Sequence, residues 1–186
     1  MAKGSSYERD IAKEFSLWLT KGKRDDILYR SQSSGARFTQ RRKSGKDTVN
    51  QAGDITFTDE LGASFIKKYN LELKTGYGKK NKDSITKWDV LDIIDSKQKL
   101  PVLIAFWNQC TRDAELSNRT PLLIFRRNQR SSCICFDIEE YNKLITYFGS
   151  CNCLYICCNN LMIMSLKMFF EWIPNISPYL EGGDLK

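Results

Sequence analysis

Residues 68–74, with the sequence KYNLELK, alternate polar and apolar side chains, and this pattern constrains the fold more than any other part of the chain. Successive side chains of a β-strand point to opposite faces, so the pattern predicts a strand with its apolar side chains in a core. Glu72 and Lys74 then share the polar face. A carboxylate beside an ammonium group there indicates either a cross-strand ion pair or a functional site.

A second short strand is predicted at residues 54–57, where Ile55 and Phe57 face the core and Asp54 points the other way. If the two strands pair as a hairpin, with a turn around residues 59–62, the carboxylates of Asp54 and Glu72 converge. Mg²⁺ binds through one or two carboxylates and keeps several waters, so such a pair could hold it. The alternative is that Asp54 is a turn residue.

The remaining periodicities predict a helix, a strand, the two strands above, a helix and a strand, followed by further elements. The expected helices are residues 5–19, 86–99 and one that begins after Asp137 and stops at Gly149. The expected additional strands are residues 27–32, 101–107, 122–126, 133–136, and the hairpin 154–158 with 161–165.

Glu8 lies on the apolar stripe of the first helix, because on a helical wheel it is within about 20° of Phe15 and Leu19. A carboxylate at this position has two possible roles. It could bond back to Ser5 as part of a capping box, or it could belong to the functional site, and both roles are compatible.

The composition narrows the chemistry of this 186-residue chain, which we expect to form a single domain over residues 1–186. It contains 29 Lys and Arg against 22 Asp and Glu, and the net charge of +7 favours a polyanionic partner over a merely soluble basic protein. Histidine is absent, which excludes mechanisms that need imidazole as base or ligand.

Residues 1–6 lack the apolar core of a signal peptide, and residues 100–107 are too short an apolar run to span a bilayer. We therefore expect an intracellular, cytoplasmic protein with no membrane association. The seven cysteines should be reduced thiols, and the spacing of those at 151–158 does not match a structural zinc site.

Four short motifs together resemble the PD-(D/E)XK nuclease superfamily, and in particular its archaeal Holliday junction resolvases. They are KGSSYERD at residues 3–10, RSQSSG at 30–35, GDI at 53–55 and LELK at 71–74. The resemblance implies an α/β, restriction-endonuclease-like fold, with a mixed central sheet flanked by helices in the order αβββαβ. The nuclease core would span about residues 5–107, with a C-terminal elaboration over about 120–180.

The resemblance also implies a role for each matching residue. Asp54 and Glu72 would bind the metal, and Lys74 would be the catalytic lysine. Glu8 would match the catalytic helix-one glutamate and could hold the metal through water or bind a second cation. Gly53 stands where the motif has proline. Ser34 would contact a phosphate, and the basic segment around it would grip DNA through Arg37, Arg41, Arg42, Lys43 and Lys46.

These expectations amount to an Mg²⁺-dependent DNA endonuclease, with Mn²⁺ as a substitute, acting on branched DNA such as Holliday junctions, as a homodimer. Two alternatives remain open. One is an endonuclease on ordinary duplex DNA, of restriction or phage-replication type. The other is a DNA-binding module that keeps the fold without cleaving.

Overall fold

The computed structural model describes residues 3–31, 53–75, 102–127, 129–152, 155–158 and 160–182. Several expectations fall outside these residues. They are the helix at 86–99 and the basic segment with Ser34, Arg37, Arg41, Arg42, Lys43 and Lys46.

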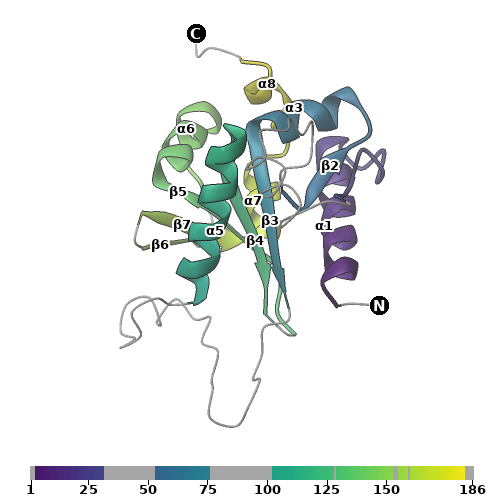
Figure 1. The fold of residues 1–186 in the computed structure, drawn as a ribbon. Helices are drawn as coiled ribbons and strands as arrows, with labels where there is room; N and C mark the ends of the chain where they lie inside the picture. The colour runs from purple at the N-terminus through teal and green to yellow at the C-terminus, as the bar shows by residue number, and fades with distance from the viewer. Residues whose placement is uncertain are drawn as a thin grey trace.

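Five strands form a central mixed sheet in the spatial order β3-β4-β5-β7-β6 (Figure 1). β3 and β4 are parallel, whereas the other neighbouring pairs are antiparallel. The strands are β3 (Tyr69–Thr75), β4 (Thr120–Arg126), β5 (Cys133–Asp137), β6 (Tyr155–Cys158) and β7 (Leu161–Ser165). β1 (Leu28–Arg30) and β2 (Ile55–Phe57) form a separate antiparallel pair. The predicted α/β fold with a mixed central sheet flanked by helices is confirmed.

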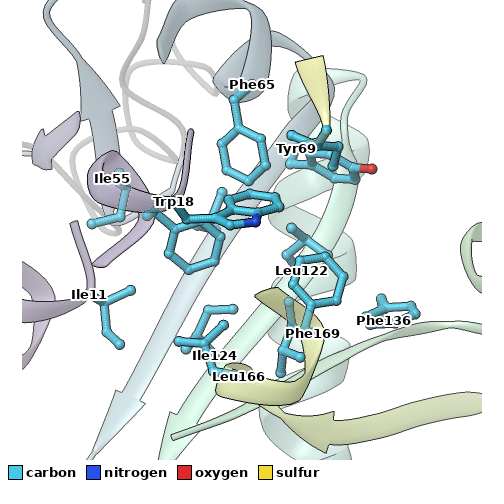
Figure 2. Close-up of a cluster of buried hydrophobic side chains, with 14 of the residues drawn as sticks. Ile11, Trp18, Ile55, Phe65, Tyr69, Leu122, Ile124, Phe136, Leu166 and Phe169 are labelled. Atoms are coloured by element: carbon cyan, nitrogen blue, oxygen red, sulfur yellow. The ribbon is translucent and has the colours of Figure 1, made fainter. Parts of the chain in front are cut away.

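Helices cover both faces of the sheet. On one face, α5 (Val102–Ser117) buries Leu103 and Cys110 against the sheet in a smaller core. The larger core lies on the opposite face, where Trp18, Phe65 and Phe169 come together from three helices (Figure 2). The helices around this core are α1 (Lys3–Leu19), α3 (Glu60–Lys68), α6 (Ile138–Phe148), α7 (Leu166–Trp172) and α8 (Ser177–Leu180). The sheet therefore separates two differently packed faces.

Several predicted elements are confirmed with small shifts at their ends. The helix α6 is capped by Asp137, whose side chain accepts from the Glu140 amide, and it ends at Gly149 with a φ of 84°. β6 and β7 form the expected hairpin. The helix α1 begins at Lys3, so Ser5 lies inside its first turn, and the predicted capping box at Ser5 is wrong.

The predicted hairpin between residues 54–57 and 68–74 is also wrong, because a helix connects the two strands. Asp59, expected in a turn, is the N-cap of α3, and its side chain accepts from the Gly62 amide at 3.1 Å. After this helix the chain enters β3, which pairs with β4 instead of β2. The two strands consequently belong to different sheets.

The strand predicted at residues 101–107 is a helix. Its apolar run continues into α5, where Leu103, Cys110 and Ala114 recur at helical spacing and are buried. A short apolar run does not by itself distinguish a buried strand from a buried helix. The following strand of the sheet is therefore β4, at residues 120–126.

Two further observations concern cysteines and membranes. Cys151 is disulfide-bonded, contrary to the expectation of reduced thiols throughout, whereas Cys110, Cys133, Cys135 and Cys157 are not in disulfides. In the described ranges, we find no helix with the length and apolarity needed to cross a bilayer.

Candidate active site

The polar face of β3 carries the predicted carboxylate and lysine, and both meet a side chain from α5. Lys74 Nζ donates to Glu72 Oε1 at 2.5 Å and to Gln109 Oε1 at 3.0 Å. Gln109 Nε2 in turn donates to Glu72 Oε1 at 2.8 Å. The three side chains thus form a closed hydrogen-bonded group between the strand and the helix.

Asp54 lies just before β2 begins, along the edge of β3 that faces away from β4. Its amide donates to the Leu71 carbonyl and its Oδ2 accepts from the Leu73 amide, each at 2.8 Å. Its own carbonyl accepts from the Ser31 amide after β1. These bonds place Asp54 beside Leu71 and Leu73, on either side of Glu72. The predicted convergence of Asp54 with Glu72 therefore occurs, although no hairpin produces it.

Gly53 explains how the chain approaches β3 so closely. Its φ is +80°, a conformation that proline cannot adopt and that other L-residues rarely do. A Cβ at this position would lie 2.8 Å from Asn70 Oδ1 and 2.9 Å from the Leu71 carbonyl oxygen. Glycine in place of the motif's proline is thus required here for the path that brings Asp54 to the edge of β3.

The electrostatics of the group depend on burial. Burial, and then the negative charge of Asp54, raises the pKa of Glu72 to about 7, whereas the ammonium of Lys74 acts in the opposite direction. Asp113, on α5, contributes a smaller increase. Two carboxylates that disfavour each other's ionisation would both be stabilised by a cation between them.

The carboxylate groups of this site are ligands of the kind that Mg²⁺ prefers. The described ranges contain no group of three or more Asp, Glu, Cys or His side chains arranged to hold a metal ion. Mg²⁺ needs fewer protein ligands, since it usually binds through one or two carboxylates and keeps its remaining waters. Asp54 and Glu72 supply two such hard oxygen ligands, held in place by backbone and side-chain hydrogen bonds.

Glu8 has a different partner. Its Oε2 accepts from Arg30 Nε at the end of β1, and its side chain is 16% exposed. Arg30 precedes Ser31, whose amide bonds to the Asp54 backbone. The structure thus brings together Asp54, Glu72 and Lys74, and it pairs Glu8 with a cation on the strand beside them.

Sequence reasoning missed Gln109 because it treated the apolar run at residues 101–107 as a strand. The available signal was the helical recurrence of Leu103, Cys110 and Ala114, which places Gln109 beside the buried Cys110. Phe106, one turn earlier, was missed for the same reason, and its ring centroid lies 5.4 Å from Lys74 Nζ.

Comparison with known families agrees with this geometry. Residues 1–162 match the family described as "Phage putative PDDEXK endonuclease". That range includes Asp54, Glu72, Lys74 and Gln109. No curated protein and no solved structure is significantly similar to the chain. Because the match covers most of the 186 residues, the chain belongs to this phage PDDEXK endonuclease family and is a nuclease.

Proposed function

We propose that the protein is an Mg²⁺-dependent endodeoxyribonuclease whose active site is formed by Asp54, Glu72 and Lys74. The observation that carries this proposal is the hydrogen-bonded group at the edge of β3, where two carboxylates and an ammonium meet within one partly buried site. Mn²⁺, which also accepts oxygen ligands, would substitute.

Hydrolysis forms a bond between a water oxygen and phosphorus and breaks one phosphorus–oxygen ester bond, leaving a phosphate monoester and a hydroxyl. When bound, the metal ion would supply charge neutralisation and activation of water. Asp54 and Glu72 would hold the cation. Lys74 stabilises negative charge that develops on the phosphoryl oxygens, and Gln109 keeps Glu72 and Lys74 in position.

Glu8 differs from the other two acids because its carboxylate is paired with Arg30 of β1, whereas Asp54 and Glu72 are bonded to groups on β3 and α5. Any contribution of Glu8 to the site would therefore be indirect, made through Arg30 or through a water molecule. The basic segment with Ser34, Arg37, Arg41, Arg42, Lys43 and Lys46 would contact DNA phosphates and position the substrate without reading its sequence.

Branched DNA is our preferred substrate, with a homodimer as the active form. Both follow from the resemblance to Holliday junction resolvases, since cutting two strands symmetrically requires two copies of the site. Ordinary duplex DNA is the competing substrate. A four-way junction compared with a linear duplex of the same sequence separates these possibilities, and light scattering of the protein measures its oligomeric state.

The decisive experiment is a plasmid-nicking assay in Mg²⁺, in Mn²⁺ and in EDTA. The wild type should nick with either metal and not in EDTA. Asp54→Asn should lower the rate by a factor of about 10³ or more, because a ligand to the cation is lost. Asp25→Asn, an exposed carboxylate before β1, is the matched control and should leave nicking unchanged.

Undiminished nicking by Asp54→Asn would contradict the proposed site. If the wild type binds DNA and nicks no substrate with either metal, the protein is the non-catalytic DNA-binding module. Melting temperatures of both variants should be measured, so that loss of folding is distinguished from loss of a ligand.

A further inference from the structure

A cavity of about 580 Å³ lies between α1, α7 and the turn that joins β4 to β5. Its volume is within the range of small-molecule sites, roughly 300–1,000 Å³. Three basic side chains, Arg126, Arg130 and Lys167, line it together with one carboxylate, Glu14. This excess of positive charge makes the cavity attractive to an anion.

The cavity is also lined by apolar side chains, and some of these are fixed by packing. Trp18 and Phe170 stack with ring centroids 4.9 Å apart and planes at 27°. Trp18 Nε1 also donates to the Ile173 carbonyl at 2.6 Å. Leu17, which is 41% exposed, also lines the cavity. Cations beside a preformed apolar surface suit a ligand that has a planar apolar part and an anionic part, as a nucleotide does.

The guanidinium of Arg126 is held in place by a contact with α1. It lies over the ring of Tyr7, with Cζ 4.4 Å from the ring centroid. Tyr7 Oη donates to Ser132 Oγ at 3.1 Å, and the Ser132 carbonyl accepts from the Leu166 amide at 2.9 Å. Because the ring of Tyr7 is itself fixed by its bond to Ser132, a ligand would find this cation already positioned.

The cavity is close to the proposed active site but on the other face of the sheet. Arg126 pairs with Thr75 in the β3–β4 register, and neighbouring strands are about 4.8 Å apart. Lys74 faces α5, whereas Arg126 follows Ile124 by two residues and so shares the face of the larger core. A DNA strand that reached both sites would have to turn around the end of the sheet.

Duplex DNA does not make such a turn easily, since its persistence length is about 150 base pairs, whereas an unpaired strand bends freely. We propose that this cavity binds one unpaired nucleotide of the DNA substrate. Its base would lie against Leu17 and Trp18, and its phosphate would contact Arg126, Arg130 and Lys167. The identity of the ligand rests on the proposed nuclease function, and the inference narrows the substrate class to DNA with a single-stranded segment beside a duplex.

The test measures DNA binding in EDTA, where no cleavage occurs. Fluorescence anisotropy compares a duplex carrying a ~6-nucleotide single-stranded tail with a blunt duplex of the same paired length. The variant is Arg130→Glu with Lys167→Glu, both exposed side chains outside the catalytic group. The control is Lys67→Glu with Lys143→Glu, which gives the same change in net charge on the exposed surfaces of α3 and α6.

We expect the Arg130/Lys167 variant to bind the tailed duplex about tenfold more weakly and the blunt duplex less than about threefold more weakly. The control variant should bind the tailed and the blunt duplex more weakly to the same extent, by less than about threefold. Leu17→Ala, which leaves the charges intact, should weaken only the tailed duplex. Equal effects of the Arg130/Lys167 variant on both duplexes, or an unchanged affinity for the tail, would overturn the inference.

A free nucleotide is the competing ligand for this cavity, and thymidine 5′-monophosphate is its probe. Binding of this nucleotide to the wild type, with no affinity gained from the tail, would indicate a free-nucleotide site and would also overturn the inference. Asp54→Asn should keep the preference for the tail. A wild type that prefers the tail but never cleaves would refute the nuclease proposal and leave the nucleotide cavity standing.

Discussion

The amide of Gln109 bonds both Glu72 and Lys74, and so it controls the relative position of the carboxylate and the ammonium group. Neither bond could be made by an apolar side chain of the same size. The donor to Glu72 also favours the ionised carboxylate, because hydrogen bonds to a charged form lower its pKa. Gln109 is therefore a positioning residue with a measurable effect on the titration of the site.

We predict that Gln109→Ala lowers kcat by about tenfold, a modest loss for a residue that acts through others. Because one donor to Glu72 is removed, the pKa of Glu72 should rise, and the acidic limb of the activity profile should move to higher pH. Asn108→Ala, at an exposed position next to Gln109, is the control. If the acidic limb of the pH–activity profile stays in place while the melting temperature falls, Gln109 has a merely structural role.

At the scale of elements, α3 connects β2 to β3 and packs closely against β1 and β2. Gly62 makes this contact possible, since a Cβ there would lie 2.7 Å from the Ile27 carbonyl oxygen and 3.0 Å from Phe57 Cβ. The close approach of the helix to this strand pair depends on the missing side chain. The packing of α3 is thus coupled to the segment that carries Asp54.

We predict that Gly62→Ala destabilises the protein by about 1–2 kcal/mol. Helix propensity favours alanine by about 1 kcal/mol, but overpacking against a backbone carbonyl costs about 1–3 kcal/mol and should outweigh it. Urea denaturation measures the difference. Ser64→Ala on the same helix should stay within about 0.5 kcal/mol of the wild type. A stabilised Gly62→Ala variant would show that the helix can shift without cost.

At the scale of the whole molecule, the buried carboxylate of Glu72 opposes folding when it is ionised. Its pKa is raised from 4.5 to about 7 in the folded protein, mainly by burial and then by Asp54. A raised pKa means that the folded state binds the proton more tightly than the unfolded state. The stabilising contribution is therefore complete below about pH 4.5 and is lost as the pH rises through about 7.

We predict that the free energy of unfolding in EDTA contains a component of about 3 kcal/mol that disappears over this pH interval. The Glu72→Gln variant should lack it, so the stability difference between variant and wild type should change with pH. Glu139→Gln, on the exposed surface of α6, should follow the wild-type curve. Parallel curves for Glu72→Gln and the wild type would contradict the raised pKa.

Local features of this protein follow from short stretches of its sequence. Alternation along β3 placed Glu72 and Lys74 on one face, and the apolar stripe with Phe15 and Leu19 predicted the buried side of α1. Asp137 and Gly149 marked the ends of α6. These features could be predicted because strand and helix periods follow from backbone geometry within a few residues, whatever the rest of the chain does.

The contacts between distant segments, in contrast, depend on the complete fold. Gly53 with a positive φ brings Asp54 along the edge of β3, in place of the predicted hairpin, and α5 brings Gln109 to Glu72 and Lys74. The cavity around Arg126 likewise combines α1, the β4–β5 turn and α7. Contacts of this kind depend on how the faces of several helices and strands pack against one another. The hydrophobic periodicity of a single segment does not reveal that packing.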